Sequence, residues 1–342
     1  MSRVSRQKLI AEIEAARGSR LLVAIWGDRE NLATIMAADA PPVFFQHLEK
    51  IGKVSKLDVL LYTLGGHTLA AWGLANLVRE YCDKLGVLVP HRALSSGTLF
   101  TLAADEIIMS RLGQLSPIDP SITSPLGPRV DLPNQPGKSQ VLPVSVEDAV
   151  GFINLATKAV GLKEERSILA AFDRLSSQVH PLALGAVYRS REQIGTLADR
   201  LLSFHMKDEA QKEERDRIVT RLTRELGSHD YLIGRTEAKT SLKLNLVDVE
   251  HDLEQKMLAL FDEYSTLLDL RLPYNQDGFL GTNQKVTGNF NRAIIESSGL
   301  THVFRTTRDI QRIKVQMPGM PMPTDGVQER TSFEGWIADN AV

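Results

Sequence analysis

The chain contains one cysteine, Cys82, among its 342 residues, so an internal disulfide and a multi-thiolate metal site are both excluded. It also lacks an excess of charge, because 40 Lys and Arg stand against 42 Asp and Glu, which leaves a net charge of −2. That balance does not support a nucleic-acid-binding protein or a basic protein of membrane surfaces. The single thiol indicates a reducing compartment, and we expect a cytoplasmic location.

Long hydrophobic runs are absent as well. The first 20 residues carry charges throughout and have no apolar core segment, so we expect no secretory signal. Residues 59–78 form the one long stretch without a formal charge, but this stretch includes Gly65, Gly66 and His67. A buried strand, a glycine turn and a packed helix explain it better than a membrane span. We expect a protein with no membrane anchor.

Apolar segments of strand length alternate with amphipathic segments along the first third of the chain. The predicted strands are residues 21–26, 57–63, 86–90 and 106–110, and the predicted helices are residues 5–16, 42–51, 69–84 and 96–104. Strands that are apolar on both faces and alternate with helices are typical of a parallel sheet covered on both sides. The sequence therefore predicts an α/β fold.

The remaining chain changes character twice. Residues 116–143 hold seven of the 15 prolines and predict a long irregular connection. Helical patterns then return over residues 146–226, with breaks expected near His180-Pro181 and Gly185, and again over residues 253–268. Beyond residue 271 the composition turns to Gly, Asn, Thr and Pro, with short β-like runs at residues 302–304 and 313–316. The predicted domains are an N-terminal helix (1–19), a main domain (20–250), and a C-terminal helix with a small appended β-rich module (251–342).

Two short motifs follow successive predicted strands. Residues 63–66 (TLGG) run from a strand end into two glycines, and residues 94–98 (LSSGT) run from a strand end directly into a helix. A serine at such a turn lies beside unpaired helix N–H groups, which can stabilise an oxyanion. We predict Ser95 as a nucleophile, with the N–H groups of Gly66 and Ser96 as the oxyanion hole. The alternative is that either serine only caps the helix, a frequent role for this residue type.

The run VPHRALSSGTLFTLAADEIIMSRLGQLSPIDP, residues 89–120, resembles the serine dehydrogenase proteinase family. That family belongs to the ClpP/crotonase superfamily and is related to signal peptide peptidase A. The family's glycine pair matches Gly65-Gly66, and its Ser-x-Gly nucleophile motif matches residues 95–97. Residues 180–189 and 229–248 resemble later family segments, although Asn245 stands where the usual ending carries a glycine.

The resemblance implies a ClpP/crotonase-like fold and a serine peptidase that cleaves polypeptides through an acyl-enzyme. It also implies a homo-oligomer, with a delivery or activating partner left open. No phosphate-binding glycine loop, pyridoxal lysine motif or two-histidine zinc motif stands out, so we expect no cofactor and no metal.

A serine nucleophile needs a neighbouring base. Clp-type enzymes use histidine, but this chain has none between His91 and His180. His91 lies four residues before Ser95, which puts their Cα atoms roughly 13 Å apart in an extended chain. His91 is therefore more readily a residue that supports the turn, and His67 is a second alternative as base or substrate contact.

Signal peptide peptidase relatives use lysine, which acts as a base when burial lowers its pKa. Lys138 is the only lysine between Lys84 and Lys158, and its placement resembles that of the relatives' lysine. We predict a Ser95–Lys138 dyad, with an exposed loop lysine as the alternative. Asp119 could orient the base or bind substrate backbone, although an aspartate between prolines is also a common turn residue.

Two other functions remain open at this stage. One is a catalytically silent oligomeric scaffold that kept the fold and binds a partner. The other is a crotonase-like acyl-CoA enzyme with the same oxyanion hole, against which the Ser-x-Gly motif argues.

Overall fold

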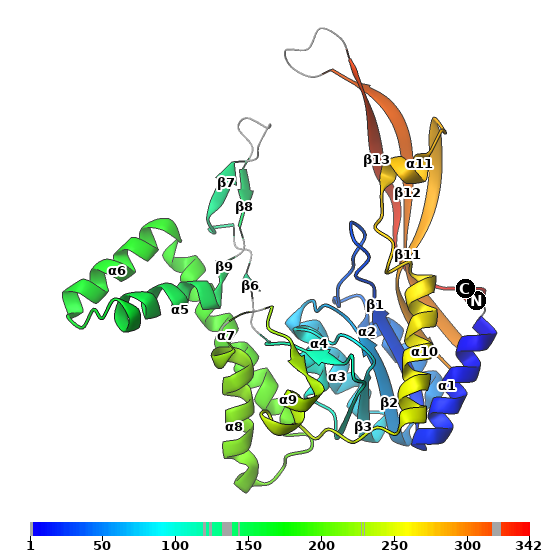
Figure 1. The fold of residues 1–342 in the computed structure, drawn as a ribbon, viewed down its shortest axis with the longest axis horizontal. Helices are drawn as coiled ribbons and strands as arrows, with labels where there is room; N and C mark the ends of the chain where they lie inside the picture. Colours follow the sequence, from blue (N-terminus) through cyan, green and yellow to red (C-terminus); the bar gives the residue numbers. More distant parts are fainter. Residues whose placement is uncertain are drawn as a thin grey trace. The chain divides into compact units, whose positions relative to one another are not determined.

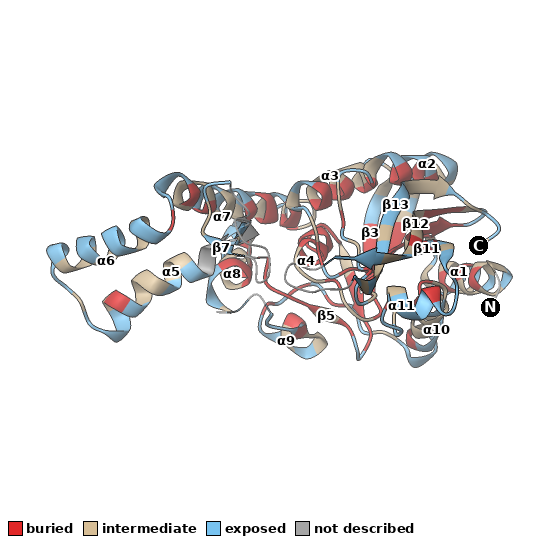
Figure 2. Cartoon of the chain, turned by 90° about the horizontal axis from the view of Figure 1, so that it is seen from above, coloured by how far each residue is buried: buried red, intermediate tan, exposed pale blue. Residues whose placement is uncertain are grey.

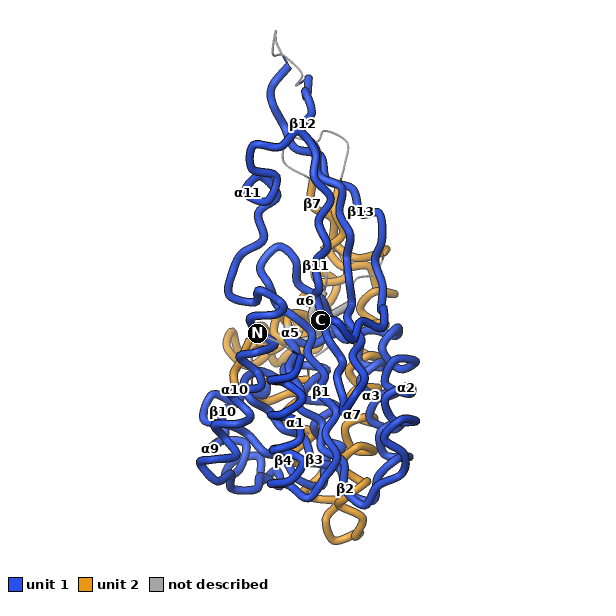
Figure 3. The backbone as a smooth tube through the Cα atoms, turned by 90° about the vertical axis from the view of Figure 1, so that its right-hand side faces the viewer, with its two compact units in different colours: residues 1–115, 234–342 blue, residues 116–233 orange. Residues whose placement is uncertain are grey.

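The computed structural model describes residues 3–118, 121–122, 125–131, 139–142, 144–226, 228, 230–316 and 323–342. The chain forms two compact units, and Figure 3 colours them separately. Unit 1 comprises residues 1–115 and 234–342, and unit 2 comprises residues 116–233.

Unit 1 is built on a seven-stranded sheet in the order β13-β12-β11-β1-β2-β3-β4 (Figure 1). Strands β1 to β4 are parallel to one another, and β11 pairs antiparallel with β1. The predicted α/β fold, with a parallel sheet flanked by helices, is confirmed. The strands are β1 (Arg20–Trp26), β2 (Val54–Tyr62), β3 (Cys82–Val89), β4 (Glu106–Met109), β11 (Lys285–Ser297), β12 (Leu300–Val315) and β13 (Thr324–Ala338), with β5 (Gln114–Leu115) beside them.

Helices cover both faces of this sheet. Ile10 and Ile13 of α1 and Met257 of α10 pack on one face, in a cluster with Val23 and Leu60 of the strands. On the other face the Trp26 ring stacks on Phe44 of α2, 6.2 Å away between centroids, and the following helices α3 and α4 pack against each other. The helices of unit 1 are α1 (Arg3–Arg17), α2 (Pro41–Ile51), α3 (Thr68–Arg79), α4 (Ser96–Thr101), α9 (Arg235–Thr240), α10 (His251–Leu267) and α11 (Gln276–Leu280).

Burial explains why the continuous apolar runs became central strands. All residues of β1 after Arg20 are buried, as are the last six residues of β2. The short helix α4 is buried as well, as its red colour in Figure 2 shows. A strand that is buried on both faces needs apolar side chains at consecutive positions rather than at alternate ones.

Two predicted element limits are wrong. The helix expected to reach Lys84 ends at Arg79, because Cys82 already pairs with Val54 at the start of β3. The break expected at Gly185 is also absent, since α7 runs unbroken from Pro181 to Leu202. The expected break at His180-Pro181 is confirmed, and α6 ends just before it at Gln178.

The β-rich C-terminal segment extends the main sheet. Val23 of β1 pairs with Glu296 of β11, and β12 and β13 continue outward from that edge. The predicted runs at 302–304 and 313–316 fall in or beside β12. The three-part domain division stays a prediction.

Unit 2 is mainly helical within its described residues. Its helices and strands are β6 (Ser121–Ile122), β7 (Arg129–Asp131), β8 (Ser139–Val141), β9 (Val144–Ser145), α5 (Val146–Asn154), η1 (Leu155–Ala159), α6 (Glu165–Gln178), α7 (Pro181–Leu202), η2 (Glu209–Gln211), α8 (Lys212–Thr220) and η3 (Arg221–Glu225), followed by β10 (Ile233–Gly234), which ends in unit 1. In the part of the chain that the structure describes, no helix has both the length and the apolar composition to cross a membrane.

A buried imidazole pair ties α2 to the β11–β12 hairpin. His47 Nδ1 lies 2.7 Å from the Ser297 hydroxyl, and His47 Nε2 lies 3.0 Å from His302 Nδ1. Burial, followed by the neighbouring His302 and Lys50, lowers the pKa of His47 to about 3. The pKa of His302 is also lowered by burial. Both rings are therefore neutral in the folded protein near pH 7.

Because of this histidine pair, we expect the folded protein to be less stable in mild acid than at neutral pH. Between pH 6.5, the ordinary pKa of histidine, and about 3, only the unfolded chain takes up a proton at His47, so the free energy of unfolding falls as the pH falls. One such group contributes a slope of up to about 1.4 kcal/mol per pH unit. Urea unfolding of wild type and His47→Gln at pH 7 and pH 5 measures it.

His47→Gln should lose less stability between the two pH values than wild type does. The control His251→Gln replaces an exposed histidine at the start of α10 and should keep the wild-type slope. Equal slopes for His47→Gln and wild type would contradict the assignment.

Candidate active site

The parallel ladder of β2 and β3 continues past the ends of both strands. The Thr63 N–H donates to the Arg92 carbonyl (2.9 Å), and the Leu94 N–H donates to the Thr63 carbonyl (3.0 Å). This pairing places the glycine pair beside Ser95. A Cβ built on Gly65 would lie 2.9 Å from the Ser95 Cβ, so only a residue without a side chain fits there. The structure thus brings Gly65 and Ser95 together.

Thr63 also shapes the glycine turn. Its hydroxyl accepts from the Gly65 N–H (2.9 Å) and lies 3.0 Å from the Gly65 carbonyl oxygen, to which it can donate. Gly65 and Gly66 have φ angles of +126° and +153°, which side chains disfavour. A Cβ on Gly66 would in addition overlap the backbone of Met36. Both glycines are therefore required by the backbone path and by close approach.

The direction of the Gly66 N–H follows from these bonds. The Gly65 carbonyl accepts from the Met36 N–H (3.0 Å), and the His67 N–H donates to the Met36 carbonyl (2.8 Å). In a trans peptide the carbonyl of one residue and the N–H of the next point in opposite directions, and the structure has no cis bond among its described residues. The Gly66 N–H therefore points away from Met36.

Ser95 occupies a strained turn directly before α4. Its φ of +51° and ψ of −111° are sparsely populated for a residue with a side chain. Within the described residues the Ser95 side chain makes no capping bond to α4, so the simple N-cap alternative gains no support. The N–H of Ser96 is the first of the helix and has no acceptor within it. Gly97 completes the turn, because a Cβ there would lie 2.5 Å from the Thr63 methyl group.

Two of the four candidate partners of Ser95, His67 and His91, lie within the described residues. His67 is exposed, at the residue before α3. His91 is half-buried, and its ring centroid lies 5.9 Å from that of Tyr62 and 6.0 Å from that of Phe261. Lys138 and Asp119 lie outside the described residues, so their predicted roles stay predictions.

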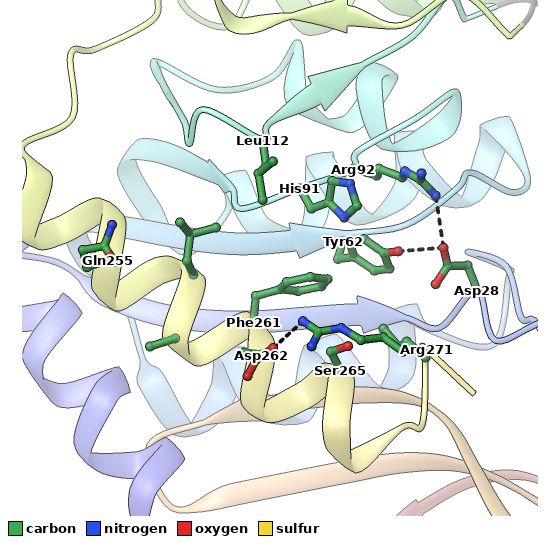
Figure 4. A pocket seen from close by; sticks show the side chains of 13 residues that line it. Asp28, Tyr62, His91, Arg92, Leu112, Gln255, Phe261, Asp262, Ser265 and Arg271 are labelled. Atoms are coloured by element: carbon green, nitrogen blue, oxygen red, sulfur yellow. Dashed lines mark hydrogen bonds and ion pairs between the residues drawn. The ribbon is translucent and has the colours of Figure 1, made fainter. Parts of the chain in front are cut away.

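The His91 ring lines a pocket of about 560 Å³ at the carboxyl ends of β1, β2 and β3 (Figure 4). Burial and the neighbouring Arg92 lower the pKa of His91, which favours the neutral ring. Asp28 follows β1, Tyr62 ends β2, and Arg92 follows β3. The Tyr62 hydroxyl donates to Asp28 (2.7 Å), and burial raises the pKa of that hydroxyl.

Asp28, Tyr62 and Arg92 were not among the site residues predicted from the sequence. A usable signal was present, because ligands of open α/β sheets bind at the carboxyl ends of the strands, and all three residues lie at such ends. Ser95 is not among the residues that line the pocket in the described structure.

Comparison with known proteins agrees with this architecture. Residues 1–130 match the family model of the ClpP-like SDH-type serine proteinases, which confirms the resemblance over this part of the chain. The matched residues are thus similar to those of a family of serine proteinases.

The relatives found are themselves uncharacterised. Uncharacterized protein MJ1495 of Methanocaldococcus jannaschii is 25% identical over 272 residues, which cover 76% of this chain and 77% of that protein. Uncharacterized protein MJ0137 of the same organism is 41% identical over 70 residues, or 20% of this chain and only 24% of that protein's length.

Two solved structures were also found. A mutant of ClpP1 from Listeria monocytogenes matches with a TM-score of 0.33 and 13% identity, covering 71% of this chain and 99% of that one. A probable enoyl-CoA hydratase/isomerase from Mycobacterium abscessus matches with a TM-score of 0.22 and 12% identity, covering 73% and 88% of the two chains.

The glycine turn yields a direct test. Gly66→Ala should lower the free energy of unfolding by at least about 2 kcal/mol, because the new Cβ meets Met36 and φ is unfavourable. Gly73→Ala is the matched control, since Gly73 lies within α3 and a Cβ there meets nothing within 4 Å. The control should be neutral or slightly stabilising. Equal stability of both variants in urea unfolding would show that the turn tolerates a side chain.

Proposed function

We propose that this protein is a serine peptidase that cleaves polypeptides through an acyl-enzyme formed on Ser95. One observation carries the proposal: the strained Ser95 turn lies against the glycine turn, with the Gly65 Cα close to the Ser95 side chain. A φ of +51° at a serine is energetically unfavourable, and such strain gathers at functional sites. The family match over residues 1–130 supports the same class of reaction.

The reaction follows from the groups around the turn. The Ser95 oxygen attacks the carbonyl carbon of the peptide bond, and its proton passes to a base. The N–H groups of Gly66 and Ser96 donate to the oxyanion of the tetrahedral intermediate. The intermediate collapses to an ester on Ser95 as the leaving amine takes the proton, and water then hydrolyses the ester by the same steps in reverse.

We propose Lys138 as the base. An unprotonated lysine can accept a proton when burial lowers its pKa. The proposal rests on the sequence, in which Lys138 is the only lysine between Lys84 and Lys158. Asp119 is proposed to orient the base or the substrate backbone, and His91 to support the turn.

The resemblance further supports a homo-oligomer that acts in the cytoplasm on a soluble polypeptide, with or without a delivery or activating partner. The proposed reaction requires no cofactor, because the nucleophile, the base and the oxyanion donors all come from the chain.

Covalent labelling tests the nucleophile. A fluorophosphonate probe should add one label to the wild-type chain in intact mass spectrometry and none to Ser95→Ala. Ser96→Ala is the matched control, since only the backbone N–H of Ser96 is used in the mechanism, and it should still be labelled. If Ser95→Ala were labelled as fully as wild type, another residue would be the nucleophile. Absence of labelling in wild type would contradict the proposal of an active nucleophile in the chain alone. It would favour a silent scaffold or a chain that needs an activating partner.

The rate of labelling tests the base. Lys138→Ala and Lys138→Arg should both slow labelling by at least about 100-fold, because arginine keeps its proton and cannot act as a base. Lys158→Ala removes an exposed lysine and should label at the wild-type rate. A wild-type rate in Lys138→Ala, with a slow rate in His91→Ala, would transfer the role to His91.

A further inference from the structure

The pocket at the carboxyl ends of β1 to β3 has an aromatic wall. The rings of Tyr62 and Phe261 lie 4.6 Å apart between centroids. The His91 ring is edge-on to Phe261 and tilted by 33° to Tyr62. Phe261 comes from α10, whose side chains close the pocket opposite the strand ends (Figure 4). A wall of this kind binds an apolar, preferably aromatic, group.

Two ion pairs are among the residues that line the pocket: Asp262 with Arg271, and Asp28 with Arg92 beside the Tyr62 ring (Figure 4). Asp28 Oδ2 accepts from the Tyr62 hydroxyl and lies 3.4 Å from Arg92 Nη1, which is long for a charged hydrogen bond. Among the described residues, Arg92 Nε is buried and has no hydrogen-bond partner. The Asp28 side chain is 13% exposed and the Arg92 side chain is 37% exposed, so both charged groups are partly buried. A carboxylate and a guanidinium that keeps one unpaired donor thus lie side by side.

We propose that this pocket binds a free α-amino acid with an aromatic or large aliphatic side chain. Its ammonium group donates to Asp28, its carboxylate accepts from Arg92, and its side chain lies against Tyr62 and Phe261. A zwitterion matches the pair because each charge meets its opposite, whereas a singly charged ligand leaves one partly buried charge unmatched. A residue inside a peptide carries neither charge and fits less well.

The neutral His91 ring is suited to the same ligand, since its two nitrogens provide one donor and one acceptor. The volume of about 560 Å³ lies in the range of small-molecule sites and accommodates one amino acid together with water. The inference goes beyond the proposed function and does not depend on it.

Calorimetric titration of the full-length Ser95→Ala chain with L-phenylalanine tests the proposal without any contribution from hydrolysis. We expect saturable one-site binding. Three analogues each lack part of the zwitterion: 3-phenylpropionate has no ammonium, 2-phenylethylamine has no carboxylate, and N-acetyl-L-phenylalaninamide has neither charge. Each should bind at least about tenfold more weakly, because a charged hydrogen bond is lost. Glycine, which has no side chain, should bind weakly as well.

Two tryptophan variants locate the site. Ala259 lines the pocket from α10, so Ala259→Trp should fill the pocket and abolish binding. Thr266 is exposed on the same helix and is not among the lining residues, so Thr266→Trp should bind as the parent does. Circular dichroism confirms that both variants fold.

The variants Arg92→Gln and Asp28→Asn test which side chain binds which charged group of the ligand. Arg92→Gln should remove the preference for phenylalanine over 2-phenylethylamine, which lacks the carboxylate. Asp28→Asn should remove the preference for phenylalanine over 3-phenylpropionate, which lacks the ammonium group. Absence of phenylalanine binding, or binding that survives Ala259→Trp, would overturn the proposal. Equally tight binding of N-acetyl-L-phenylalaninamide would also overturn it and would indicate a pocket for side chains of a polypeptide.

Discussion

The parallel pairing of β2 and β3, carried one step beyond the strand ends by the Thr63–Ala93 bridge, is the constraint on which the candidate site depends. Parallel strands hold a fixed register, so the segment after β2 must run beside the segment after β3. Thr63 then fixes the glycine turn through its own hydroxyl. Backbone pairing consequently positions the Ser95 turn, and the rest of the sheet serves to keep that register.

The sequence was sufficient to predict those elements whose structure depends mainly on neighbouring residues. Continuous apolar runs predicted β1 to β4, and the two glycines and Ser95 could be placed at strand ends because turns that require φ > 0 or close packing have few solutions. The C-terminal end of α3 could not be predicted in this way. Residues 82–84 continue the amphipathic pattern of α3, and only their pairing with β2 makes them a strand. Likewise, nothing near residue 290 indicates that β11 will pair with β1, more than 260 residues earlier.

The pocket escaped sequence reasoning for a related reason. Asp28, Tyr62 and Arg92 belong to three different strand ends, and Phe261 comes from a helix far along the chain. None of these residues forms a motif with its sequence neighbours. Their association is a property of the sheet, and it becomes visible only once strand order and register are known. The proposed base is harder still to predict, because Lys138 lies in a segment whose sequence shows little periodicity.

The left-handed conformation of Ser95 has a thermodynamic consequence of its own. Glycine would adopt this backbone without steric penalty, while a serine there costs about 1–3 kcal/mol of folding free energy. The chain is therefore less stable than a version of itself that differs at this one position. Selection for stability alone would therefore favour the loss of the side chain at residue 95.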